Sequence, residues 1–192
     1  MNSGTKQLAL SSILNAVKES QIFWILSFSA LTAVAAQITI PVKPVPFTLQ
    51  TMIVILAGAF LGARNGFYSQ IIYLLLGVTG LPVFAHTPDA GMGLARLIGP
   101  TGGYLLAFPL AAFLVGYLIE KNKSYLPVVL SMSLGAVIIL ACGTLYLNFA
   151  YLHDFSTSLK AGAGIFSIWT IVKVFAAAAI YFAVTKNRKK TS

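Results

Sequence analysis

Acidic side chains are almost missing from this sequence: only four of its 192 residues are Asp or Glu, against thirteen Lys or Arg. Charged residues make up 9% of the chain, whereas soluble domains carry about 25%. Hydrophobic residues make up 58%. This composition predicts a protein that resides in a lipid bilayer. A net charge of +9 indicates nucleic-acid binding in a soluble protein. Here the basic residues lie between apolar runs, so we expect membrane lipid and no nucleic acid as their partner.

Cysteine and histidine are nearly absent too. The sequence has one cysteine, Cys142, inside an apolar run, and two histidines. These numbers exclude disulfides and Cys/His metal centres, and we expect no metal and no other cofactor. The sequence contains no HExxH, no GxxxxGK[ST] phosphate loop and no paired nucleophile and base. We therefore expect no enzyme activity, and an ATP-driven process would need a partner chain to supply the ATPase.

Long apolar runs dominate what is present. A membrane-spanning helix needs about 20 apolar residues, so we predict an all-α polytopic membrane protein with six transmembrane helices in a single domain. The predicted core covers residues 22–184, between an N-terminal segment (1–21) and a basic tail (185–192). Lys18 and the run ending in Ala33-Val34-Ala35 resemble a signal peptide, but we expect this run to be retained as the first span. The six predicted segments are Ile22–Ile40, Phe47–Ala63, Gly66–Ala85, Tyr104–Ile119, Tyr125–Leu152 and Ala161–Val184.

The distribution of Lys and Arg predicts the orientation of these spans. With the N-terminus inside, three basic residues fall on the outer side (Lys43, Arg96 and Lys160) and nine on the inner side: Lys6, Lys18, Arg64, Lys121, Lys123, Lys186, Arg188, Lys189 and Lys190. Basic residues concentrate in cytoplasmic loops, so both termini are predicted to be cytoplasmic in a multi-pass protein of the cell membrane. The outer loops are longer and richer in Gly, Pro and Thr, so we expect function on that side.

Lys173 is the one charged residue inside a predicted span. A lysine near the centre of a bilayer costs about 2.5–3.5 kcal/mol on insertion scales, so it usually faces a cavity or binds an anion. We interpret Lys173 as a ligand for the carboxylate of a small molecule, although it could instead extend to the membrane interface. Thr170 lies three residues earlier, on the same helical face.

The outer loop from His86 to Gly103 contains the run GPTGG, four backbone breakers in five residues beside Arg96. Gly permits close backbone approach, and Thr101 is predicted to cap the helix that follows. The loop is too long for a plain turn, so we expect a compact lid that offers backbone donors and one cation. His86, Arg96, Gly99 and Thr101 are therefore candidate ligand contacts.

Polar residues at the outer end of the fifth predicted span are further candidates. Tyr146 and Asn148 must find partners within the membrane, and Asp154 follows in the next loop. Tyr146 could equally belong to an aromatic belt, and Asp154 to a solvated loop. The first span carries small residues at helical spacing, namely Ser29, Ala33 and Ala36, which either dock on another membrane protein or pack within the bundle.

Four stretches resemble the BioY family, the biotin-binding S-components of energy-coupling factor (ECF) transporters. They are PVPFTLQT from Pro44, LAGAFLG from Leu56, GVTGLPVFA from Gly77 and GLARLIGPTGGYLLAFPLAAFLVGYL from Gly93. The resemblance implies a six-helix protein that captures biotin from outside and associates with a transmembrane coupling protein and two ATPase subunits. The small residues of the first span are similar to the family's Ala-x-x-x-Ala docking motif.

The resemblance also bears on the predicted site. The family's last helix usually carries Pro-Gly-Asp-x-x-Lys, and Lys173 matches its lysine. Thr170 stands where the Asp is expected and accepts hydrogen bonds without a charge, which roughly halves their strength. Asp154 or Asn148 could substitute for that Asp. The implied function is biotin capture by the substrate-specific subunit of an ATP-driven importer. The alternatives are an S-component for another vitamin and a solitary facilitator or ion-coupled carrier, although the latter usually shows inverted repeats and intramembrane acids.

Overall fold

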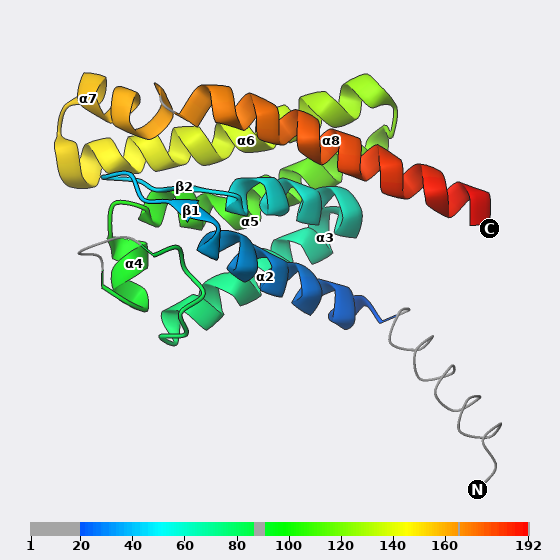
Figure 1. Ribbon diagram of the computed structural model, residues 1–192, viewed down its shortest axis with the longest axis horizontal. Coiled ribbons are helices and arrows are strands. Elements are labelled where there is room, and N and C mark those ends of the chain that lie inside the picture. Colours follow the sequence, from blue (N-terminus) through cyan, green and yellow to red (C-terminus); the bar gives the residue numbers. More distant parts are fainter. Residues whose placement is uncertain (1–19, 87–90, 165, 192) are drawn as a thin grey trace, which may run out of the picture.

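The computed structural model describes residues 20–86, 91–164 and 166–191, which form a bundle of helices (Figure 1). Residues 1–19 of the predicted N-terminal segment, residues 87–90 of the long outer loop and the last residue of the tail lie outside the described residues. The predicted all-α membrane architecture is confirmed, with one small addition. A two-stranded antiparallel ribbon, β1 (Thr39–Ile40) and β2 (Phe47–Thr48), follows the first described helix.

That first helix, α2 (Gln21–Gln37), begins where Ser20 Oγ accepts a hydrogen bond from the Phe23 amide at 3.4 Å. A serine at this position satisfies one of the helix's unpaired amides. The predicted segment Ile22–Ile40 ends too late, because its last two residues leave the helix to form β1. The ribbon then leads directly into the next helix.

The helix α3 (Gln50–Val78) is folded back on itself at Gly62, where φ is 79° and ψ is −179°. A Cβ added to Gly66 would lie 2.9 Å from Gly58 Cα. In a straight helix those two positions would be about 12 Å apart, so the two arms of α3 pack against each other. The arms correspond to the predicted segments Phe47–Ala63 and Gly66–Ala85, with the second ending at Val78. Glu120 Oε1 accepts from the Ala63 amide at 2.9 Å and so caps the second arm.

Glycines bring α3 close to α5 (Gly102–Lys121). A Cβ on Gly58 would lie 2.2 Å from Ala112 O, and one on Gly116 would lie 2.4 Å from Ala63 N. Small residues allow such backbone approach between membrane helices, where dispersion contacts replace the hydrophobic effect as the packing force. The remaining long helices are α6 (Tyr125–Leu147) and α8 (Phe166–Thr191).

Hydropathy along the described chain agrees with this arrangement. Four stretches are long and apolar enough to cross a membrane, and Gln21–Gln37 is a shorter apolar helix; the four are Gln50–Val78, Gly102–Lys121, Tyr125–Leu152 and Phe155–Asn187. Because α3 contains two arms, the described chain provides six apolar helical segments, as predicted.

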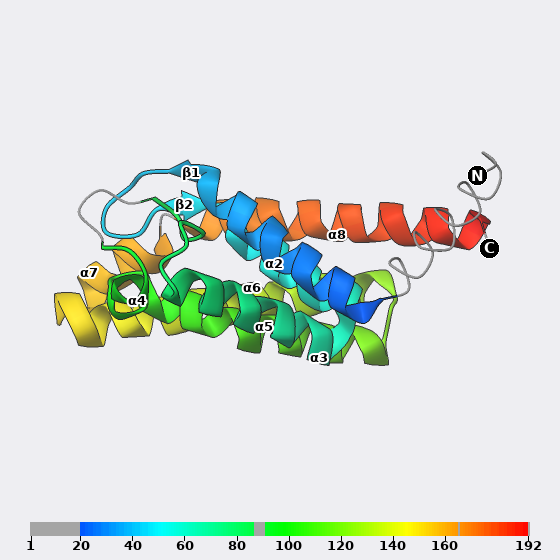
Figure 2. The same cartoon turned by 90° about the horizontal axis from the view of Figure 1, so that it is seen from below.

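The short elements gather at one end of the bundle (Figures 1 and 2). They are both strands, α4 (Leu94–Ile98), α7 (Phe155–Leu159) and the π-helical turns Asn148–Leu152 and Lys160–Gly164. The start of α2 and the end of α8 lie at the opposite end. The loops that the charge distribution assigns to the outer side therefore share one end of the molecule.

The small residues of α2 pack inside the bundle. Ser29 is 1% exposed and Ala36 is fully buried, while Ala33 is partly buried. Thr32 hydrogen-bonds with buried Gln70 of α3, which ties the two helices together. The docking prediction for Ser29 and Ala36 is therefore wrong for this conformation, since neither side chain is accessible to a partner. The alternative, packing within the bundle, describes them.

Candidate functional site

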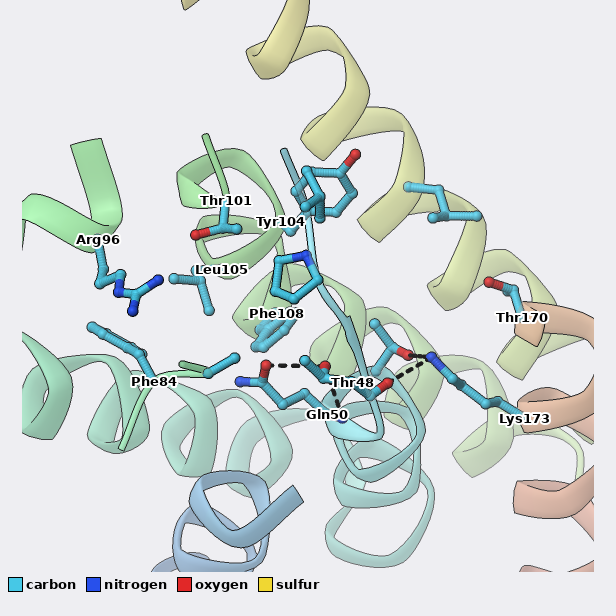
Figure 3. A pocket seen from close by; sticks show the side chains of 15 residues that line it. Thr48, Gln50, Phe84, Arg96, Thr101, Tyr104, Leu105, Phe108, Thr170 and Lys173 are labelled. Atoms are coloured by element: carbon cyan, nitrogen blue, oxygen red, sulfur yellow. Dashed lines mark hydrogen bonds between the residues drawn. The ribbon is translucent and has the colours of Figure 1, made fainter. Parts of the chain in front are cut away.

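A cavity opens beneath the short elements, where five helices and the ribbon converge (Figure 3). The cavity volume is about 60 Å³, so the cavity is narrow. Its walls are Val45, Pro46, Thr48, Gln50, Thr51, Phe84, Ala85, Arg96, Thr101, Tyr104, Leu105, Phe108, Leu140, Thr170 and Lys173.

Lys173 reaches the cavity from α8, in agreement with its predicted position. Its Nζ donates to the carbonyl oxygen of Thr48 at 2.7 Å and to Thr51 Oγ1 at 3.2 Å (Figure 3). An ammonium has three donors, so one remains for a ligand. No acidic side chain is among the described residues that line the cavity. The site therefore carries an uncompensated positive charge suited to an anion or a carbonyl oxygen.

Arg96 lies on the opposite side of the cavity, on α4 (Figure 3). Its side chain is only 7% exposed, and none of the described residues accepts a hydrogen bond from it. Burial lowers the pKa of this guanidinium from its ordinary value, but an arginine keeps its charge in proteins. Its planar fork matches a carboxylate in two parallel hydrogen bonds.

The wall between these cations is mainly aromatic. Phe84, Tyr104 and Phe108 belong to the apolar cluster around the cavity, and the Tyr104 hydroxyl donates to Gly162 O at 2.8 Å. These rings provide a surface for the apolar part of a ligand. Trp169 of α8 is 53% exposed and does not line the cavity.

Gln50 is a lining residue that the sequence reasoning missed. It is 3% exposed, and its Nε2 donates to the Tyr73 hydroxyl, which in turn donates to Val83 O at 3.2 Å. Its Oε1 accepts from the Thr48 hydroxyl at 3.1 Å. The polar residues of PVPFTLQT could have indicated this site, since Thr48 and Gln50 interrupt a mainly apolar stretch.

The predicted lid residues divide into two groups. Arg96 and Thr101 line the cavity, and so does Thr170 from α8. Thr101 occupies the N-cap position of α5, but its side chain makes no capping hydrogen bond, contrary to the prediction. Gly99 ends α4, and its carbonyl accepts from the Gly102 amide at 2.9 Å; it does not line the cavity.

The other predicted ligand contacts lie outside the cavity lining. Tyr146 donates to the carbonyls of α4, Asn148 Oδ1 accepts from Ser158 Oγ at 3.4 Å, and His86 is exposed. Asp154 is the N-cap of α7 and accepts from the Ser156 and Thr157 amides. The Thr157 hydroxyl also donates to this carboxylate and lowers its pKa. Asp154 is therefore an exposed loop residue, which was the alternative to a ligand contact.

Residues 7–190 match the model of the BioY family. The chain belongs to the BioY family. This confirms the resemblance on nearly the whole chain, well beyond the four stretches that suggested it. Two curated members show how close the similarity is. "Biotin transporter BioY" of Thermotoga maritima is 42% identical over 159 residues, which cover 83% of this chain and 92% of that protein. "Biotin transporter BioY2" of Lactococcus lactis subsp. cremoris is 38% identical over 146 residues, covering 76% and 79%.

A solved structure has the same fold as this BioY-family chain. It is the crystal structure of the S-component for biotin from an ECF-type ABC transporter. The TM-score is 0.78 at 25% identity, and the alignment covers 97% of this chain and 95% of that one. The two chains therefore share their overall fold over nearly their whole lengths.

Proposed function

We propose that this protein captures biotin at the outer face of the cell membrane and serves as the substrate-specific subunit of an ATP-driven ECF importer. One observation carries the proposal. A chain of the BioY family encloses, between its helices, a cavity with two cationic side chains, no acidic lining residue among those described and an aromatic wall. Relatives named biotin transporters and the ECF-type biotin S-component support it. The function is transport and not catalysis.

Biotin presents the groups that these walls complement. Its carboxylate pairs with the Arg96 guanidinium, which has no hydrogen-bond partner among the described residues. Its ureido oxygen accepts from the third Nζ donor of Lys173, and a ureido N–H donates to the Thr170 hydroxyl on the same face of α8. The apolar chain between these ends packs on the rings of Phe84 and Phe108. This pose uses the two cations at opposite sides of the cavity for two different oxygens (Figure 3).

Equilibrium binding to the purified protein tests the ligand assignment. Radiolabelled biotin is titrated with unlabelled biotin, thiamine or riboflavin as competitor. We expect competition by biotin alone, since neither of the other vitamins carries a carboxylate for Arg96. Displacement by thiamine or riboflavin, or no binding of biotin, would overturn the proposal.

The proposed orientation places the cavity outside and both termini in the cytoplasm. Single cysteines at Lys160 and Lys186, in a Cys142→Ser background, report it by labelling with a membrane-impermeant maleimide in intact cells. Both native side chains are exposed on the protein surface, and the two positions lie near the two ends of the last apolar stretch. We expect labelling at position 160 and none at position 186, and the reverse pattern would invert the topology.

The ECF partners are a coupling protein and two ATPase subunits, since the sequence carries no phosphate loop of its own. Proteoliposomes that contain this chain alone, or this chain with a reconstituted ECF module, separate the candidate mechanisms. We expect biotin uptake only with the module and ATP. Uptake by the chain alone would instead identify a solitary facilitator.

A further inference from the structure

Two tyrosine hydroxyls converge on the end of α4, the short helix that carries Arg96. Tyr146 Oη donates to Ile98 O at 2.9 Å and to Leu97 O at 3.4 Å. Tyr151 Oη donates to the same Ile98 carbonyl. The two rings lie with their centroids 6.2 Å apart, so both approach this carbonyl from the α6 side. The two carbonyls belong to the residues directly after Arg96.

The helix α4 depends on such external contacts. It has five residues, Leu94–Ile98, between the cap residues Gly93 and Gly99, and neither end has a capping side chain. A helix this short is unstable by itself, and its last carbonyls have no partner within it. The tyrosine hydroxyls supply partners for two of them. They therefore fix both the position of α4 and the direction in which its arginine leaves the backbone.

The glycine run GPTGG makes this contact possible. A Cβ on Gly103 would lie 2.2 Å from Tyr146 Cβ, and one on Gly102 would lie 1.9 Å from Leu97 O. No larger residue fits at either position without moving α4 or α6. The glycines thus let the Tyr146 ring lie against the start of α5 and reach the end of α4. A plain inter-helix turn would not require this approach.

We propose that Tyr146 and Tyr151 are positioning residues that clamp α4, so that the Arg96 guanidinium is held ready for the ligand's carboxylate. Neither tyrosine lines the cavity, so neither contacts the ligand directly. The inference rests on the proposed function, because it assigns the carboxylate of biotin to Arg96. It changes the role of Tyr146 from the ligand contact predicted from the sequence to a support for one.

Binding of biotin and of biotinamide separates positioning from a general structural role. Biotinamide replaces the carboxylate by a neutral amide and keeps the bicyclic head. The double variant Tyr146→Phe/Tyr151→Phe keeps both rings and removes only the hydroxyls. Loss of two hydrogen bonds predicts a rise of the Kd for biotin of about tenfold. The Kd for biotinamide should rise by less, because its amide oxygen accepts one hydrogen bond from Arg96 and lacks the paired charge and the second parallel bond of a carboxylate.

The same substitutions in an Arg96→Gln background complete the test. There the hydroxyls have no guanidinium to position, so we expect them to have no further effect on biotin binding. Tyr68→Phe is the matched control, since this exposed tyrosine of α3 does not line the cavity. The two single variants, measured in the same way, provide the readout if the double variant does not fold.

Two results would overturn the proposal: an equal loss of affinity for biotin and biotinamide, or full additivity with Arg96→Gln. Either would leave the tyrosines a purely structural role. Failure of the wild-type protein to bind biotin is a separate outcome, which refutes the proposed function and not the clamp alone.

Discussion

Replacing Lys173 by methionine removes the ammonium from the cavity and keeps a side chain of similar length. In the structure Nζ uses two of its three donors, on Thr48 O and Thr51 Oγ1. In the proposed pose the third donates to the ureido oxygen of biotin and leaves both of these bonds in place. A hydrogen bond to a charged group contributes about 1.5–3 kcal/mol, which corresponds to an affinity loss of about 10- to 150-fold in Lys173→Met.

The measurement is a biotin titration of purified wild type and Lys173→Met, by calorimetry or radioligand binding, after the thermal unfolding midpoint has confirmed that both are folded. Lys160→Met is the matched control, because it removes the same charge from an exposed position at the same end of the bundle. We expect this control to bind biotin within about threefold of wild type.

A Kd for Lys173→Met within about twofold of wild type would refute this reasoning, since a charge that faces the ligand cannot be removed without effect. An equal loss in Lys160→Met would also refute it. Such a result would show that affinity depends on the total positive charge at this end of the bundle and not on a hydrogen bond from Lys173 in the cavity.

Three further predictions concern single contacts. Thr170→Val should weaken biotin binding by about 2- to 12-fold, because it removes a neutral hydrogen bond. Thr170→Ser keeps the hydroxyl and should bind biotin as wild type does. Biotin titration compares the two variants, and equal affinities would refute this prediction. Gly103→Ala should destabilise the fold by about 1–3 kcal/mol, because its Cβ would meet Tyr146 Cβ at 2.2 Å. Gly164→Ala should not, since its nearest contact is at 3.6 Å, and thermal unfolding compares the two. Glu120→Ala should lower the free energy of unfolding by about 1 kcal/mol through loss of the Ala63 cap, and biotin affinity should not change. A changed affinity there would show coupling between the two ends.

Lys173 lines the cavity, as predicted, because a lone charge in an apolar run has few stable positions, while its role as a ligand for a carboxylate stays a prediction. Insertion cost forces such a residue to face a cavity or the interface. The prediction for Asp154 had no such constraint. An exposed carboxylate before a helix is stable as an N-cap, and the structure shows it accepting hydrogen bonds from two amides of α7.

Gln50 is a cavity residue whose hydrogen-bond partners could not be predicted from the sequence pattern. It lies at the start of a long helix, and its polar side chain in an apolar stretch indicates a buried amide but not the partners of that amide. Its environment comes from Tyr73 on the other arm of α3 and from the ribbon, and both are brought to it by the turn at Gly62. The small residues of α2 show the opposite case, since one spacing pattern serves external docking and internal packing equally well. Their burial in the bundle distinguishes the two.

By itself, the sequence determined the membrane class, the number of apolar segments, the charge asymmetry between the loops and the one lysine within a span that lines the cavity. These follow from composition and hydropathy, because the cost of placing charge and backbone polar groups in lipid acts on each segment separately. Only the tertiary structure decided which residues surround the cavity and which support them from outside. The residues around the cavity come from the ribbon, α3, the segment that follows α3, α4, α5, α6 and α8. Their meeting depends on how the helices pack and not on any local pattern.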